Sequence, residues 1–430
     1  MQQSLRRLGL LSLLLIALAA CGSGTIQTGP GSFATATTVL NAFSLGSDFP
    51  PDVQIPDIAG MDSTAFVVTF TPAAVVPVDL NSTPLKVSEQ FKVLDLSTLP
   101  AAAFPNRLRL LSPTQGLLLA GAALIYFNPG TGAILGQTDL GAALDLTETL
   151  AYSRPGDCDF DGSPESSVGP GTFSPSFAAD LAVLGGKVFV TMSNSCFDPD
   201  FSSFYVQGLV RIFDLHEAEP FLTPAAKPYL ALSGFNATGL TVANGKLIAT
   251  SSGDTELVGN ASLPETPSFL DEIDPQTLQI TRSLNLGKVA ANFRAMAVTE
   301  DGAEGFLGSS AFSEVYEINL RNFSVQRGID NPISVSALEQ DYISDQTIPF
   351  GGKLLFVSSF NQSQVFAIDL ADPNLPVLEQ SLNFAFSENP GVTGAGPMAV
   401  RPGEPGVDFS GPDLFVLTNA PGTISTAKTY

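Results

Sequence analysis

The sequence has no tryptophan, a single histidine (His216) and only three cysteines among its 430 residues. One histidine argues against zinc sites built on several imidazoles and against histidine-based catalytic relays. Lysine and arginine are also scarce, 19 against 42 aspartates and glutamates, which gives a net charge of −23. Nucleic acids and anionic surfaces bind clustered basic residues, so we expect no nucleic-acid partner.

Several cofactor motifs are missing as well. The sequence contains no Gly-rich nucleotide loop in strand and helix context and no CxxCH haem site, so we expect no haem, nucleotide or zinc. Beyond the N-terminus, no run stays apolar for the roughly 18 residues that a membrane-spanning helix needs. The longest such run, residues 116–127, predicts a pair of buried strands.

The N-terminus reads as a targeting segment. Arg6 and Arg7 precede an apolar stretch, residues 8–20, that ends in Leu-Ala-Ala directly before Cys21. This pattern resembles a bacterial lipoprotein signal peptide. The resemblance implies cleavage after residue 20 and attachment of palmitate-type acyl chains to Cys21, which together anchor stably in a membrane. It implies the cell envelope, and Gly22 in place of Asp favours the outer membrane, at its periplasmic face or the cell surface.

Residues 21–34 continue as a Gly/Ser/Thr/Pro-rich tether, and a repeated hairpin pattern then occupies residues 35–430. Its clearest copy is LLFVSSFNQSQVFAIDL, residues 354–370, in which two strand-like runs flank a polar turn. Each copy ends its second run in Asp or Asn, whose side chain is expected to cap the following turn: Asp79, Asn128, Asp214, Asp274, Asn319 and Asp369. Gly-rich turns precede the copies at Gly185–Gly186, Asn244–Gly245, Asp301–Gly302 and Gly351–Gly352.

Short strands, such turns and a period of about 40 to 50 residues predict an all-β fold, a single β-propeller domain over residues 35–430. We expect seven four-stranded blades, six full units and an incomplete C-terminal unit, with six or eight blades as the alternatives; a pair of two-sheet sandwiches is disfavoured by the number of units. A strand at Thr37–Leu45 would join that last blade and close the ring, because an open ring exposes strand edges. The units resemble the YVTN-type repeats of bacterial envelope propellers, although none carries the full signature.

Two cysteines remain besides Cys21. An even pair in an exported chain predicts a disulfide between Cys158 and Cys196. Cys158 lies in an insertion between blades two and three, residues 145–177, and Cys196 lies between the second and third strands of blade three. In a propeller these two classes of loop emerge on the same face, so the pairing is geometrically reasonable.

The first of these loops also carries an acidic motif. Asp157, Asp159 and Asp161 form a DxDxDG sequence that resembles the start of a calcium loop. The twelfth position is Val168 instead of the usual Glu, so the bidentate ligand is missing. The remaining ligands would come from Ser163, Glu165, Asp198 and Asp200. A solvated acidic turn is the alternative, and both stay open; a calcium ion here would rigidify the loop rather than perform chemistry.

The long insertions, residues 145–177, 193–207 and 251–268, are expected to crowd one sector of one face. The leading interpretation is a membrane-anchored, exported lipoprotein that binds a protein, glycan or small ligand without catalysis. One alternative is a propeller hydrolase, lactonase or lyase with a central calcium ion, although few acids are expected on the inner strands. Another is a structural component of an envelope assembly. Arg294 and Arg401 stand near inner strands, either lining the channel or paired with aspartates.

Overall fold

The computed structural model describes residues 43–45, 50–99, 104–158, 161–198, 203–258, 261–336, 341–349, 352–378, 382–383, 394–403, 413–419 and 422–427. Every regular element within these ranges is a β-strand. None of these residues belongs to a helix of the length and apolarity needed to cross a membrane. The targeting segment, Cys21 and the tether lie outside the described residues.

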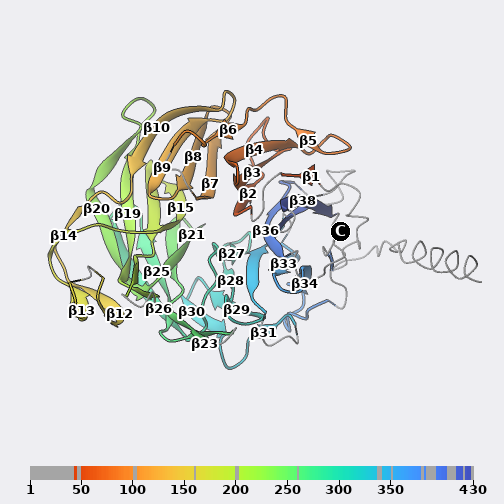
Figure 1. Cartoon of the computed structure of the whole chain (residues 1–430). Helices are drawn as coiled ribbons and strands as arrows, with labels where there is room; N and C mark the ends of the chain where they lie inside the picture. The colour runs from red at the N-terminus through yellow and green to blue at the C-terminus, as the bar shows by residue number, and fades with distance from the viewer. Residues whose placement is uncertain are drawn as a thin grey trace, which may run out of the picture.

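Hydrogen bonding arranges the strands in seven sheets of four or five strands, placed radially with their first strands towards the centre (Figure 1). Six of these sheets are self-contained blades, each made from one continuous stretch of chain. The first blade contains β2 (Asp52–Gln54), β3 (Thr64–Phe70), β4 (Ala73–Asp79), β5 (Lys86–Val87) and β6 (Leu94–Asp95). The second contains β7 (Pro105–Ser112), β8 (Gln115–Ala120), β9 (Ala123–Asn128) and β10 (Ala133–Asp139). The third contains β15 (Ala178–Leu184), β16 (Lys187–Met192), β19 (Gln207–Leu215) and β20 (Leu222–Phe235).

The next three blades follow the same order along the chain. The fourth blade contains β21 (Ala237–Ala243), β22 (Lys246–Ser251), β25 (Ser268–Asp274) and β26 (Gln279–Gly287). The fifth contains β27 (Ala297–Val298), β28 (Glu304–Gly308), β29 (Glu314–Asn319), β30 (Ser324–Arg327) and β31 (Ile333–Ser334). The sixth contains β32 (Ile343–Thr347), β33 (Leu354–Ser359), β34 (Gln364–Asp369) and β35 (Leu382–Asn383). The all-β propeller predicted from the repeats is therefore confirmed.

The seventh sheet is shared between the two ends of the chain. It contains β36 (Ala395–Val400), β37 (Leu414–Asn419), β38 (Gly422–Ala427) and, at its outer edge, β1 (Phe43–Ser44). Phe43 pairs with Ile424 and Ser44 with Thr423 in antiparallel register. The predicted closure of the ring by an N-terminal strand is thus confirmed for its described residues; residues 37–42 lie outside them.

The expectation of four strands in every blade is wrong for two blades. The two-residue strand β5 covers only Val78 and Asp79 of β4, and β6 then pairs with Ala74 and Val75. In the same way β31 pairs with the half of β29 that β30 leaves uncovered. The outer edge of the third strand offers more hydrogen-bonding groups than one short strand can use, so the chain returns to cover the rest.

The turn residues behave as the sequence predicted. The side-chain oxygens of five markers accept forward backbone N–H bonds of 2.9–3.2 Å, as in Asp79 to Asn81 and Asn128 to Thr131. Asp214 instead forms an ion pair with Lys187 on the neighbouring strand. Gly186, Gly245, Gly302 and Gly352 have φ between +61° and +73°, the left-handed conformation that these tight turns require.

The core consists of apolar layers between neighbouring sheets. Phe66 and Val68 of the first blade pack with Leu118 and Phe127 of the second, for example. The composite sheet is held in the same way, since Phe415 and Leu417 pack against Ala65 and Val67 of the first blade. Because each layer removes large side chains from water, burial between blades supplies much of the free energy that keeps the ring closed.

Candidate functional site

One face of the propeller carries the three insertions noted in the sequence, residues 145–177, 193–207 and 251–268. Inner strands begin, second strands end and third strands begin at the same face, as the pairing of Ala178 with Met192 and of Met192 with Leu209 shows. We call it the insertion face. The insertions fold into two-stranded ribbons, β11 (Leu144–Leu146) with β14 (Gly171–Phe173), β12 (Leu150–Gly156) with β13 (Glu165–Val168), β17 (Ser195–Phe197) with β18 (Ser203–Tyr205), and β23 (Thr255–Val258) with β24 (Ala261–Pro264).

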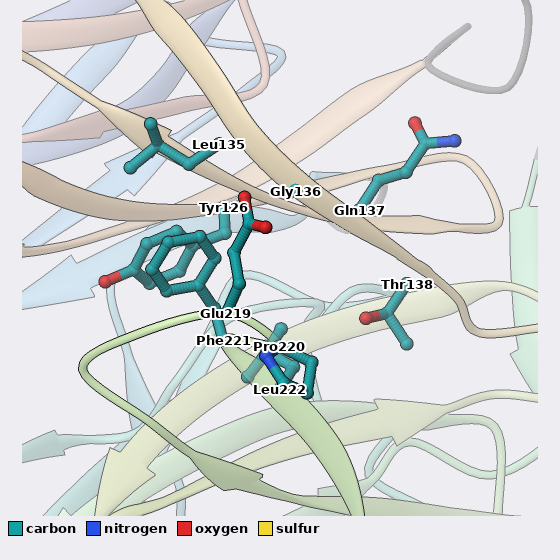
Figure 2. A pocket seen from close by; sticks show the side chains of 9 residues that line it. All are labelled: Tyr126, Leu135, Gly136, Gln137, Thr138, Glu219, Pro220, Phe221 and Leu222. Atoms are coloured by element: carbon teal, nitrogen blue, oxygen red, sulfur yellow. The ribbon is translucent and has the colours of Figure 1, made fainter.

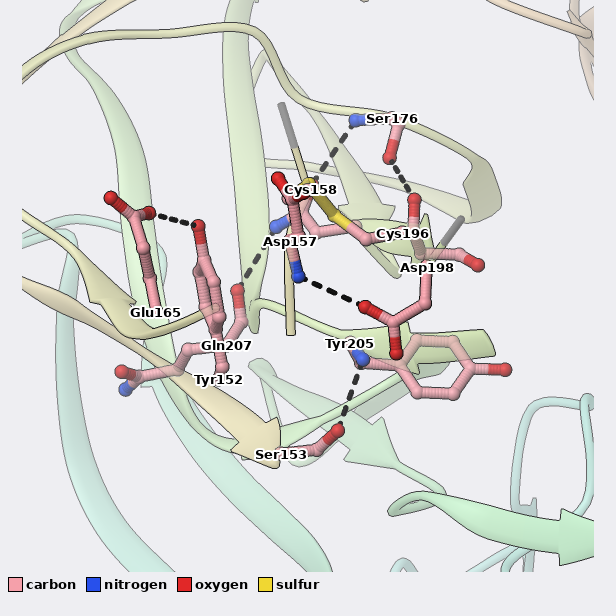
Figure 3. The surroundings of a disulfide bond; sticks show 12 residues. Tyr152, Ser153, Asp157, Cys158, Glu165, Ser176, Cys196, Asp198, Tyr205 and Gln207 are labelled. Atoms are coloured by element: carbon pink, nitrogen blue, oxygen red, sulfur yellow. Dashed lines mark hydrogen bonds between the residues drawn. A yellow bond between two sulfur atoms is a disulfide. The ribbon is translucent and has the colours of Figure 1, made fainter. Parts of the chain in front are cut away.

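Ser153 on β12 ties three of these ribbons together. Its hydroxyl donates to Asp254 Oδ2, directly before β23, over 2.6 Å and accepts from the backbone N–H of Tyr205 on β18 over 3.0 Å (Figure 3). Asp254 is only 4% exposed, and this burial raises the pKa of its carboxyl group. The insertions therefore gather in one sector of the insertion face, as the sequence predicted.

The predicted disulfide is confirmed. Cys158, just after β12, is bonded to Cys196 on β17 across a Cα–Cα distance of 5.4 Å (Figure 3). Beside it, Ser176 donates its hydroxyl to the carbonyl of Ser195. The bridge thus links the insertion between two blades to the insertion within the next blade.

The acidic loop is organised by hydrogen bonds to the chain itself. Both carboxylate oxygens of buried Asp157 accept backbone N–H groups, from Asp161 at 3.1 Å and from Gly162 at 2.9 Å. Asp198 accepts from the N–H of Asp157 and forms a 2.7 Å ion pair with Arg154.

The other predicted ligands are spread apart or fall outside the described chain. Glu165 accepts from the Tyr152 hydroxyl, and the N–H of Ser163 donates to Asp161. Asp159 and Asp200 lie outside the described residues. Within the part of the chain that the structure describes, no group of three or more His, Cys, Asp or Glu side chains is placed to hold a metal ion. A calcium ion at this loop stays a prediction.

A charged cavity of about 310 Å³ lies among the inner strands. Three aspartates and three arginines line it: Asp52, Asp180, Asp345, Arg107, Arg109 and Arg294. The expectation that few acids converge on the inner strands was therefore wrong. Of the two arginines noted in the sequence, Arg294 lines this cavity and pairs with Asp52 at 3.0 Å, whereas Arg401 bonds the Asn81 side chain.

The three aspartates connect three of the inner strands, β2, β15 and β32, to the next inner strand around the ring. Asp52 Oδ2 accepts from the N–H of Leu108, Asp180 Oδ2 from that of Leu240, and Asp345 Oδ2 from that of Met398, over 2.8–2.9 Å. Each aspartate thus satisfies a backbone donor of the neighbouring blade. This pattern could have been sought as an Asp within the first three residues of an inner strand, as in β2, β15 and β32.

The charges in this cavity are not fully matched. Asp180 lies 3.8 Å from Arg107 and 3.4 Å from Arg109. Asp345 has no cationic partner within 4.0 Å among the described residues, and burial raises the pKa of its carboxyl. Burial, reinforced by the charge of Arg294, lowers the pKa of Arg107 to about 10.

Exposed phenylalanines surround the insertion-face end of the ring. Phe104, Phe177, Phe197 and Phe293 are 72%, 57%, 44% and 52% exposed, and all four lie on this face. Phe177 and Phe197 meet edge to face with ring centroids 6.5 Å apart, and Phe104 meets Phe70 in the same way. Within the described chain, no phenylalanine is comparably exposed on the opposite face.

A separate groove of about 520 Å³ lies between the outer strands of the second and third blades (Figure 2). Phe221, just before β20, stacks on Tyr126 of β9 with ring centroids 4.4 Å apart. The rest of the lining comes from residues 135–138 of β10 and from Glu219, Pro220 and Leu222. His216, in the turn nearby, contacts Thr223 and is exposed, so it is a turn residue.

No family model and no curated protein matches this chain. Solved structures do. The β-propeller domain of Myceliophteria thermophila Cps50 (Swd1) matches with a TM-score of 0.54 and 11% identity over 90% of this chain and 98% of that one. Kuenenia stuttgartiensis hydrazine synthase matches with a TM-score of 0.55 and 10% identity over 90% and 97%. At such identities the likeness shows the β-propeller fold alone.

Proposed function

We propose that the protein is an exported, lipid-anchored binding propeller that holds a protein or glycan on its insertion face without catalysis. The observation that carries this proposal is the presentation of phenylalanines on that face. Exposed aromatic side chains grouped on a rigid scaffold are typical of contact surfaces, where they stack on sugar rings or enter apolar pockets.

Two of these phenylalanines occupy a backbone conformation that is unfavourable for a bulky residue. Phe104 and Phe177 directly precede inner strands β7 and β15 with φ of 81° and 56°. Asn236 holds the corresponding position before β21 with φ 54°. The left-handed conformation costs a residue other than Gly or Asn roughly 1–2 kcal/mol. An exposed phenylalanine ring gains little free energy from burial that could offset this conformational cost. Binding is therefore the simplest reason for a phenylalanine at these two positions.

Replacing both residues by asparagine separates binding from folding. Phe104→Asn with Phe177→Asn should keep or slightly raise the thermal midpoint, because asparagine tolerates positive φ. The same variant should lose most of the partner captured from native envelope with the full chain. Val242→Asn is the matched control, since Val242 is 44% exposed at the end of β21 on the opposite face. Equal capture by all three proteins would contradict the proposal.

The anchor is tested independently. Cys21→Ser should abolish incorporation of a palmitate analogue and move the protein from the membrane fraction to the soluble fraction. Cys158→Ser provides a control, because that cysteine is used in the disulfide. Incorporation that persists in the Cys21→Ser protein would overturn lipidation at this residue.

The two alternatives make different predictions in the same capture experiment. A structural component of an envelope assembly would copurify as a stable complex in fixed proportion with or without chelator. A hydrolase, lactonase or lyase would require a central calcium ion, which the aspartates of the central cavity would have to bind. Those carboxylates already accept backbone N–H groups or pair with arginine, so the binding function is favoured.

A further inference from the structure

A second cavity, about 420 Å³, opens at the insertion-face end of the central cavity. We call it the mouth. It shares Arg107 and Arg294 with the central cavity, and its size falls in the range of small-ligand pockets. The remaining lining is mainly aromatic and proline side chains with two serines: Pro50, Pro51, Phe70, Phe293, Tyr342, Phe360, Pro397, Ser310 and Ser344 among them.

The two guanidinium groups of the mouth lie side by side. The carbonyl of Pro51 accepts from Arg294 Nη2 at 2.6 Å and from Arg107 Nη1 at 3.4 Å. Arg107 also donates to the carbonyls of Asn106 and Phe293. These carbonyls fix the orientation of the guanidinium planes, but they carry no formal charge. The arrangement is therefore a rigid pair of like charges.

Carboxylates compensate these charges only from the inner side. Asp52, which pairs with Arg294, and Asp180, near Arg107, line the central cavity and not the mouth. No aspartate or glutamate is among the described residues that line the mouth. Arg107 and Arg294 are therefore the charged side chains that the described lining of the mouth presents to a ligand. An anion placed there would reduce the repulsion that contributes to the lowered pKa of Arg107.

The walls of the mouth are flat and apolar. Phe360 stacks on Tyr342 with ring centroids 4.8 Å apart and an angle of 19° between the planes. Phe293, the residue before Arg294, is 52% exposed, so its ring remains available for a further contact. Such walls suit a planar ring.

We propose that the mouth binds a small aromatic carboxylate, with its carboxylate on Arg107 and Arg294 and its ring among Phe70, Phe293 and Phe360. Arginine pairs are well suited to carboxylates because their N–H groups match the two oxygens. The mouth shares Phe293 with the exposed phenylalanines of the insertion face, but its tests leave Phe104 and Phe177 unchanged, so they can fail separately from the test of the proposed function.

Calorimetric titration of the full chain with 2-naphthoate, 2-naphthamide and sulfate tests the proposal. Naphthoate should bind, and the amide, which has the same ring without the charge, should bind at least tenfold more weakly. Sulfate, which has charge without a ring, should also be at least tenfold weaker. Equal affinity of acid and amide, or no binding of naphthoate, would overturn the proposal.

Variants locate the site. Arg294→Gln should weaken naphthoate binding at least tenfold, and Phe293→Ala should weaken it about three- to tenfold without disturbing a buried group. Arg321→Gln is the control for loss of one positive charge, because the Arg321 side chain is 65% exposed in a surface pair with Asp301. If Arg294→Gln does not fold, the Phe293 variant decides alone. Undiminished binding by that variant would place the ligand elsewhere.

Discussion

Substitution of Asp180 by alanine is expected to lower the free energy of unfolding by about 3–5 kcal/mol. The Asp180 side chain is 1% exposed and lies beside Arg107 and Arg109. Its other oxygen accepts the backbone N–H of Leu240, which belongs to the next blade. Alanine would leave the buried Arg107 without this carboxylate and the N–H without an acceptor, and each loss is costly in a low-dielectric interior.

Asp180→Asn separates the two contributions. Asparagine retains an acceptor for Leu240 but removes the negative charge, so its cost should fall between that of alanine and zero. Glu89→Ala is the control for loss of an acidic side chain from an ion pair, because Glu89 is 87% exposed opposite Lys86. Exposed pairs contribute about 0–1 kcal/mol. Urea unfolding midpoints measure all three variants. If Asp180→Ala costs no more than Glu89→Ala, the carboxylate does not hold the blades together.

Removal of the disulfide should have an effect of similar size. The bridge spans 38 residues between Cys158 and Cys196, and the chain-entropy estimate for a loop of this length is roughly 3–4 kcal/mol. The double variant Cys158→Ser/Cys196→Ser should unfold at lower urea concentration than the parent protein. Because the bridge joins two insertions, limited proteolysis should cut first in β12–β13 or β17–β18.

Reductant supplies the matched comparison. The parent protein in reductant should approach the stability of the double variant, whereas the double variant should not respond to reductant. A response that persists in the variant would show that another cysteine is responsible. Equal stability and equal proteolysis of parent and variant would show that hydrogen bonds, including those of Ser153, suffice to hold the ribbons.

The sequence alone was informative wherever structure depends on neighbouring residues. In five of the six hairpins the Asp or Asn at the end caps a turn two or three residues later, so its role can be read from a short window. The same holds for the glycines with positive φ. The disulfide and the closing strand involve distant residues, but composition and the incomplete last unit left few other partners.

The charged cavity was not predicted, because it depends on which strands lie innermost and on their register. Asp52, Asp180 and Asp345 are more than a hundred residues apart, and nothing near each of them marks it as buried. The division of the outer strand into two short strands in two of the blades was not predicted, for a related reason. Strands of two residues, such as β5 and β31, have no periodicity to detect. They form only because a neighbouring edge has unused hydrogen-bonding groups.

The pairing of β1 with β38 also sets the order in which the molecule can be assembled. A chain is synthesised from its N-terminus, so β1 appears early and its partner appears last. During that interval the first blade lacks the neighbour against which Ala65 and Val67 finally pack. Completion of the last sheet is therefore a late event, and a chain truncated before residue 422 would lack β38, so β1 would lose its partner and the outer edge of β37 would be left unpaired.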